Sequence, residues 1–252
     1  SRGLGDVYKR QLTYSGSGAP SVEGINFKAM KGQTIGVIGG TGSGKSSLVN
    51  LIPRLYDATQ GEVLVDGVNV KDYDIEALRN KVGIVMQKAV LFKGTIRENM
   101  WMGKKGATDE QIDEALEISQ SKEFVDSKQG RLDYVIEQGG KNLSGGQRQR
   151  LTIARAIVRK PDVLILDDSA SALDFATDAA LRKAIRGMNN SPTVFIVSQR
   201  AASLMYADLI IVLDDGQVAG MGTHDELLAN CEVYKEIYES QFKKADSEGG
   251  VA

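Results

Sequence analysis

The chain has 252 residues, of which 42% are hydrophobic and 25% charged, and its formal net charge is −2. This length and composition fit a globular protein with a sizeable core, and the charge gives no electrostatic reason to expect nucleic acid as a partner. No apolar run approaches the roughly 18 residues that cross a bilayer. The single cysteine excludes an internal disulfide, and the single histidine nearly excludes histidine-cluster metal sites and most Ser-His-Asp arrangements.

The two ends of the chain differ from the rest. DVYKRQ (6–11) resembles the in-frame translation of a transposon-end adapter used in preparing sequencing libraries; the alternative is a natural but unstructured arm. We therefore leave residues 1–11 out of the fold prediction and expect the domain to occupy residues 12–242. Residues 243–252 are expected to form a charged, frayed tail.

Short apolar strands and two hairpins are predicted along residues 12–242. The strands are rich in Val, Ile and Leu and too short for buried helices. Asp-Gly between alternating segments is a strong hairpin signal, and it occurs at Asp66-Gly67 and Asp215-Gly216. The predicted strands are TIGVI (34–38), the two halves of GEVLVDGVNV (61–70), VLIL (163–166), TVFIV (193–197), LIIVL (209–213) and QVAG (217–220).

Helices are predicted between these strands from capping residues and apolar periodicity. Thr108 and Gln111 form a capping box, and Thr223 and Glu226 form another, which places His224 in the first turn of a helix. Strands alternating with helices predict an α/β fold with a mainly parallel sheet, and the hairpins predict an antiparallel flank. The predicted helices are 45–55, 108–126, 147–158 and one that begins near His224.

GGTGSGKS (39–46) fits the phosphate-loop pattern and lies directly between a predicted strand and a predicted helix. Glycines allow successive backbone N–H groups to form a concave anion site, Lys45 would reach the β- and γ-phosphates, and the Ser46 hydroxyl would coordinate Mg²⁺. The alternative, an ordinary glycine-rich turn, is disfavoured by the flanking elements. The predicted ATP-binding residues here are Gly39, Gly40, Thr41, Gly42, Ser43, Gly44, Lys45, Ser46 and Ser47.

VLILDD (163–168) ends a buried strand with two adjacent carboxylates. Asp167 is placed as a second anchor for Mg²⁺, acting through water. An apolar strand that ends in aspartate is weak support alone, but together with the phosphate loop it is strong. The role of Asp168 depends on the family to which the chain is compared.

LSGGQRQRLTIARAI (143–157) opens with Ser144 as a helix cap and Gln147 three residues later. Each glycine costs about 1 kcal/mol in a helix relative to alanine, so Gly145 and Gly146 suit a backbone that approaches a phosphate. With the phosphate loop, VMQKAVLFKGTIREN (85–99), VLILDD and SALD (171–174), residues 12–242 resemble the ATP-binding cassette (ABC) ATPases. The resemblance implies a P-loop NTPase core with an inserted α-helical subdomain at about 88–158.

The resemblance also implies roles for individual residues. Tyr14 would stack on adenine, and Gln87 would contact Mg²⁺ and sense the γ-phosphate. Glu137 lies where exporters carry a coupling-loop acid, although IEQGG departs from the commoner sequence. Asp174 would cross a dimer interface. The residues expected to contact ATP held by a partner subunit are Ser144, Gly145, Gly146 and Gln147.

Two positions depart from the family pattern. Asp168 stands where the family usually has a glutamate that activates water, and the missing methylene retracts the carboxylate by about 1.5 Å. Gln199 stands where the family usually has a histidine that contacts the γ-phosphate, and glutamine cannot relay a proton. We therefore expect Asp168, Gln199, Lys45 and Gln87 to form a catalytic set of low activity, that is, a degenerate half-site.

The sequence therefore predicts the ATP-binding subunit of a heterodimeric ABC exporter at the cytoplasmic face of the plasma membrane, with ATP and Mg²⁺ as ligands. The transmembrane domain would lie outside this sequence and would make the only membrane contact. A soluble ABC ATPase acting on DNA or ribosomes is disfavoured, because coiled-coil insertions and a second cassette are missing. A nucleotide-regulated binding module remains the third alternative.

Overall fold

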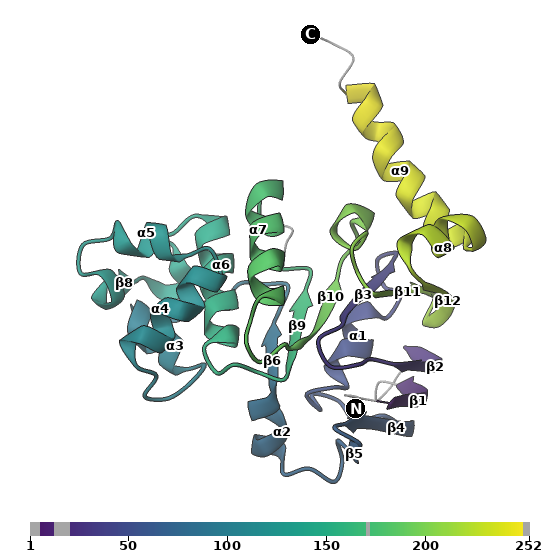
Figure 1. Cartoon of the computed structure of the whole chain (residues 1–252), viewed down its shortest axis with the longest axis horizontal. Coiled ribbons are helices and arrows are strands. Elements are labelled where there is room, and N and C mark those ends of the chain that lie inside the picture. The colour runs from purple at the N-terminus through teal and green to yellow at the C-terminus, as the bar shows by residue number, and fades with distance from the viewer. Residues whose placement is uncertain (1–5, 13–20, 170–171, 249–252) are drawn as a thin grey trace. The chain divides into compact units, whose positions relative to one another are not determined.

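The computed structural model describes the backbone of residues 6–12, 21–169 and 172–248, and the side chains of 21–169 and 172–241. Contacts divide the chain into two compact units, the first formed by Ser1–Arg79 with Thr193–Ala252 and the second by Asn80–Pro192. Within the described residues no helix combines the length and apolar character that a membrane span requires. Figure 1 labels the helices and strands of both units.

The first unit contains the predicted parallel strands. β3 (Thr34–Gly39) pairs in parallel with β10 (Thr193–Val197) and with β11 (Leu209–Asp214). All residues of β3 and β10 are buried, as expected for central strands of a parallel sheet. β11 turns through Asp215-Gly216, both with positive φ, into antiparallel β12 (Gln217–Gly222), so this hairpin prediction is confirmed.

An antiparallel sheet in the same unit has the order β2-β1-β4-β5. Asp66-Gly67 joins β4 to β5 with positive φ at both residues, as predicted. β1 pairs with both β2 and β4, so the backbone of residues 6–11, which the fold prediction left out, lies in a strand with a neighbour on each side. The strands are β1 (Asp6–Leu12), β2 (Val22–Lys28), β4 (Gln60–Val65) and β5 (Val68–Asn69).

Two helices of this unit differ from the sequence prediction. α1 (Lys45–Asn50) ends before Leu55, because Pro53 lacks the N–H that a continuing helix needs, and single turns follow. α9 (Glu232–Glu248) includes most of the segment expected to fray, where Lys, Ala and Glu favour helix. The remaining helices are α2 (Ile75–Lys81), which reaches the unit boundary, η3 (Ala201–Ser203) and α8 (His224–Asn230), which Thr223 caps as predicted.

The second unit contains two parallel strands and a group of helices. β6 (Val82–Val85) pairs in parallel with β9 (Val163–Asp167), so their carboxyl ends lie together. β7 (Gly94–Thr95) and β8 (Val135–Ile136) form a short antiparallel pair. α7 (Phe175–Arg186) follows β9.

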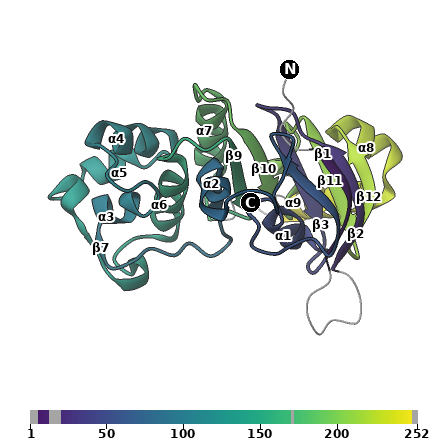
Figure 2. The ribbon, with the colours of Figure 1, turned by 90° about the horizontal axis from the view of Figure 1, so that it is seen from below.

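Helices α3 to α6 gather together within this unit (Figure 2). The predicted helix 108–126 is divided in two, because Gln120 has a φ of +59° that no α-helix accommodates. α6 carries a buried apolar stripe against α3 and α4, as the periodicity predicts. The elements are α3 (Ile96–Trp101), α4 (Asp109–Ile118), α5 (Lys122–Asp126), η1 (Arg131–Asp133), η2 (Gln138–Gly140) and α6 (Gly145–Ile157).

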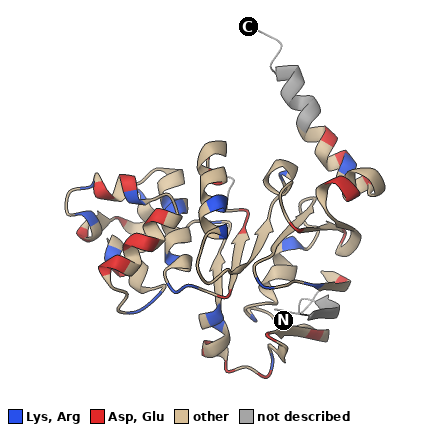
Figure 3. Cartoon of the chain, in the orientation of Figure 1, with Lys and Arg blue, Asp and Glu red and all other residues tan. Residues whose placement is uncertain are grey.

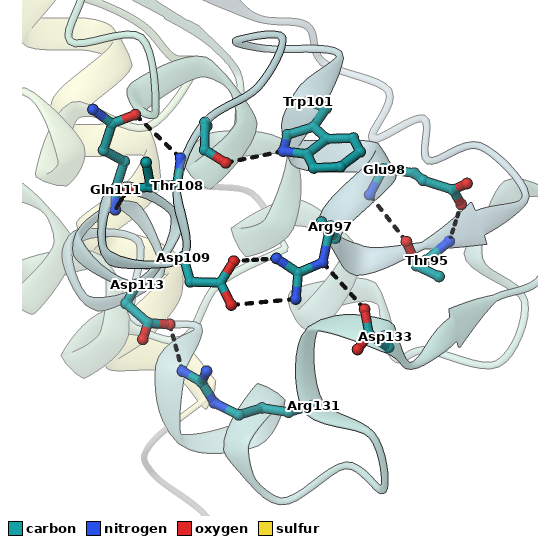
Figure 4. A network of polar contacts seen from close by, with 11 residues as sticks. Thr95, Arg97, Glu98, Trp101, Thr108, Asp109, Gln111, Asp113, Arg131 and Asp133 are labelled. Carbon is teal, nitrogen blue, oxygen red and sulfur yellow. Dashed lines mark hydrogen bonds and ion pairs between the residues drawn. The ribbon is translucent and has the colours of Figure 1, made fainter.

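Two arginines tie these helices together through the acidic residues of α4 and its neighbours (Figures 3 and 4). Arg97 of α3 donates to Asp109 of α4 and, over 3.1 Å, to Asp133 of η1. Arg131 of η1 pairs with Asp113 of α4 and, over 2.6 Å, with Asp126 of α5. The hydrogen bond from Arg97 lowers the pKa of Asp109.

Replacing Arg97 by methionine should lower the thermal stability of the chain in a pH-dependent way. A carboxyl whose folded-state pKa is depressed contributes stability above its ordinary pKa of about 4 and loses it as the pH falls through the folded value. We therefore expect the difference in melting temperature between parent and Arg97→Met to be largest near pH 7 and to shrink below about pH 4. Lys105→Met, at an exposed turn before α4, is the control. A difference that is the same at both pH values would contradict this role.

Candidate functional site

The phosphate loop connects β3 to α1 in the first unit, as the sequence predicts. Gly44, the residue before α1, has a φ of +91°, and a Cβ atom there would lie 2.6 Å from the carbonyl oxygen of Ser21. A side chain is therefore excluded at this position. Gly44 makes no side-chain cap at the N-terminus of α1, and a helix N-terminus that directly follows a glycine-rich loop is the arrangement that binds anions.

Lys45 lies folded over this loop. Its side chain is buried, and Nζ donates to the carbonyl oxygens of Gly39 (2.9 Å) and Gly40 (2.6 Å), with Ser43 Oγ at 3.4 Å. The ammonium is thus held at the loop, where a bound phosphate would replace neutral carbonyl partners by a charge-assisted contact. Thr41, Gly42, Ser46 and Ser47 lie in the same loop and the first turn of α1. Tyr14 lies outside the described residues.

Asp167, Asp168 and Gln87 come together in the second unit. Leu166 of β9 is paired with Val85 of β6, so Asp168 and Gln87 each follow this pair by two residues. Gln87 Nε2 donates to Asp168 Oδ2 over 3.2 Å. Asp167 is buried at the end of β9, and Asp168 has a φ of +45°, which aspartate tolerates better than most residues. The sequence prediction missed the contact between Gln87 and Asp168, because it did not include β6, the strand that brings Gln87 beside the end of β9.

Ser144 caps α6 with the predicted capping box. Its Oγ accepts from the N–H of Gln147 (3.2 Å), and Gln147 Oε1 accepts from the N–H of Ser144 (3.0 Å). A Cβ at Gly145 would have no neighbour nearer than 4.0 Å, and one at Gly146 would make an ordinary contact of 3.4 Å. Packing within the described chain therefore does not require these two glycines. Their position at a helix N-terminus is consistent with a group from outside the chain that approaches this backbone closely.

Asp174 caps α7. Its Oδ1 accepts from the N–H of Thr177 (2.9 Å) and its Oδ2 from the Thr177 hydroxyl (2.7 Å), and these hydrogen bonds lower the pKa of Asp174. Phe175, the next residue, is 77% exposed. Glu137 is also exposed, and its N–H donates to Asn142 Oδ1 over 3.0 Å.

Gln199 follows β10 in the first unit, two residues beyond Val197. Its carbonyl oxygen accepts a hydrogen bond from Gln241 of α9 over 2.7 Å. The structure thus groups Lys45 with its loop in one unit and Gln87 with Asp168 in the other. Gln241 was not predicted, because nothing in the sequence near it marks a contact with a residue 42 positions away.

The structure matches that of a known exporter. Its fold aligns with the "Structure of a bacterial Atm1-family ABC exporter with ATP bound" at a TM-score of 0.90 and 30% identity, covering 96% of this chain and 42% of that chain. Residues 22–171 match the sequence profile of the family described as ABC transporter.

The chain belongs to the ABC transporter family. Its nucleotide-binding fold and mainly parallel sheet are as the sequence predicted. The resemblance first drawn from LSGGQ and the phosphate loop is confirmed.

Curated relatives of this ABC transporter chain include proteins from three bacteria. An uncharacterized ABC transporter ATP-binding protein of Mycobacterium bovis is 43% identical over 95% of this chain. YfiB of Bacillus subtilis, also an uncharacterized ABC transporter ATP-binding protein, is 44% identical over 90%. A Staphylococcus aureus protein with the provisional name multidrug export ATP-binding/permease protein is 38% identical over 94%. The chain spans 41% of the length of the Mycobacterium and Staphylococcus proteins and 39% of YfiB.

Proposed function

We propose that this chain is the ATP-binding subunit of an ABC exporter and that its own half-site binds MgATP but hydrolyses it slowly. The observation that carries the second part is Asp168, a short carboxylate that accepts a hydrogen bond from Gln87. A general base must lie within about 2.6–3.2 Å of its proton donor, and a misplacement of about 1 Å costs on the order of 10²-fold in rate. Asp168 is therefore suited to order water rather than to deprotonate it.

The side chains proposed as metal ligands would suit Mg²⁺. The Ser46 hydroxyl, the Gln87 amide oxygen and the Asp167 carboxylate are hard donors, which Mg²⁺ prefers. The described residues contain no cluster of three or more His, Cys, Asp or Glu side chains placed to hold a metal. Mg²⁺ usually keeps several waters and binds substrate phosphates, so here it would take its remaining ligands from nucleotide phosphates and water and would neutralise charge on the β- and γ-phosphates.

The partner in this proposal is a second nucleotide-binding subunit of different sequence. Ser144 and the Gly145–Gly146 amides at the N-terminus of α6 would contact ATP held by that partner, and Asp174 would lie at the same interface. The companion would carry glutamate at the position of Asp168 and histidine at the position of Gln199. A transmembrane domain, outside this sequence, would place the assembly at the cytoplasmic face of the plasma membrane. The Atm1-family and multidrug export names of its relatives support an exporter.

The Asp168→Glu and Gln199→His double variant tests the slow half-site. The double variant restores the longer carboxylate at position 168 and, at position 199, a side chain that can carry a proton. Beside a partner with an intact LSGGQ segment, it should hydrolyse ATP at this half-site at least tenfold faster than the parent, about 1.4 kcal/mol. Each single change should give less, because base and switch act together. Asp168→Asn is the control, since asparagine also tolerates positive φ. If the double variant hydrolyses ATP no faster than the parent, neither the side-chain length at position 168 nor proton transfer at position 199 limits this site.

A further inference from the structure

The loop after β10 is held on both sides of Gln199. Before it, the N–H of Ser198 donates to the carbonyl oxygen of Val37 in β3 over 3.1 Å, and Ser198 Oγ accepts from the N–H of Arg200 over 2.9 Å. After it, the chain enters η3 through Ala201, which is fully buried. β3 leads directly into the phosphate loop, so the start of this loop is tied to the strand that carries the phosphate site.

The other side of the loop is held by one side chain of α9. Gln241 Nε2 donates to the carbonyl oxygen of Gln199 (2.7 Å), and Gln241 Oε1 accepts from the N–H of Ala201 (2.9 Å). A single carboxamide therefore bridges two backbone groups of opposite kind, two residues apart. These bonds restrain the backbone on the carboxyl side of Gln199, from which its side chain projects.

The two contacts require a side chain that both donates and accepts, as an amide does. An ionised carboxylate accepts but does not donate, and methionine does neither effectively. α9 is placed for this contact by the fully buried Tyr234 near its start and by its packing on η3 and β11. The bridge thus connects the C-terminal helix to the loop that carries Gln199, within one compact unit.

We propose that Gln241 is a positioning residue for Gln199, so that α9 sets how well this half-site distinguishes ATP from ADP. The inference rests on the proposed function, in which Gln199 faces the γ-phosphate. ADP lacks that phosphate, so a loop that is no longer fixed loses affinity for ATP but not for ADP. The phosphate loop and Lys45, which bind both nucleotides, are unchanged.

The test measures dissociation constants of the full chain for ATP and ADP with Mg²⁺, together with melting temperatures. Gln241→Met should lower the ratio Kd(ADP)/Kd(ATP) about threefold or more, the order expected when the hydrogen bond between Gln199 and the γ-phosphate is weakened. Gln241→Glu should lower it at least as far, because it sets a carboxylate against the Gln199 carbonyl. The Ser240 hydroxyl donates to the carbonyl oxygen of Ile237, one turn back in α9, so Ser240→Ala should leave the ratio unchanged.

A second comparison separates positioning from general stability. If Gln241 acts through Gln199, adding Gln241→Met to Gln199→Ala should lower the ratio no further than Gln199→Ala alone. If Gln241→Met leaves the ratio unchanged while the parent chain binds ATP more tightly than ADP, the inference is overturned and the proposed function is left intact. Equal losses in Ser240→Ala, or additive losses in the double variant, would also overturn it. If the parent chain binds neither nucleotide, the proposed function fails and this inference falls with it.

Discussion

Lys45→Ala should weaken MgATP binding to this chain by about 100-fold or more. The ammonium is buried and held over the phosphate loop by the carbonyl oxygens of Gly39 and Gly40. A charge-assisted hydrogen bond contributes about 1.5–3 kcal/mol, and every 1.4 kcal/mol is a factor of ten in affinity. Alanine removes both that bond and the only side-chain cation of GGTGSGKS, so the loss should be at the upper end of this range.

The matched control for this change is Lys71→Ala. Lys71 lies in the same unit, and its Nζ also donates to a backbone carbonyl, that of Ala58 over 2.9 Å. Titration of both variants with MgATP, at a temperature well below their melting points, separates nucleotide affinity from fold stability. If Lys45→Ala binds MgATP as the parent does, the loop is not the phosphate site.

Gly145→Asp should abolish nearly all ATPase activity of the assembled pair while the chain stays folded. A Cβ at Gly145 would meet only Nη2 of Arg148, at 4.0 Å, so the new side chain displaces nothing within the described chain. A carboxylate in the first turn of a helix is favourable to that helix. The same carboxylate would repel the γ-phosphate of ATP held by a partner, because it places a negative charge at the N-terminus of α6, where that phosphate would be bound.

α4 provides an internal comparison for this substitution. There the capping box of Thr108 and Gln111 is followed by Asp109, the residue type that Gly145→Asp would introduce after Ser144. The fold therefore accommodates an aspartate at the first position of a capped helix. Thermal unfolding should show a melting temperature equal to or above that of the parent, with ATP binding to the phosphate loop retained. Full ATPase activity in the pair would show that this helix end does not meet a phosphate.

Much of the fold could be predicted because its signals are local. The strands near Ile35, Ile165 and Phe195 are short apolar runs, and both Asp-Gly hairpins form where predicted. The capping boxes at Thr108, Ser144 and Thr223 were also correct. Each of these depends on residues within three or four positions of one another.

The errors arose where tertiary contacts or single backbone angles decide the structure. Gln120 divides a helix that apolar periodicity alone would continue, since a positive φ at one residue leaves no periodic trace. β1 forms because β2 and β4 flank it, irrespective of the origin of its residues. The Gln241 bridge and the Gln87–Asp168 contact join residues 42 and 81 positions apart, so only the folded chain brings them together.

The central claim is that the main catalytic contribution of this chain lies at the N-terminus of α6 and not at Asp168. The direct test compares Ser144→Arg with Asp168→Asn, side by side, in a pair reconstituted with a companion that carries the glutamate and histidine. Ser144→Arg should suppress ATPase activity almost completely, because it places bulk where the partner's phosphate would be bound. Asp168→Asn should reduce it far less. If Asp168→Asn is the more damaging change, the working site belongs to this chain and the assignment is inverted.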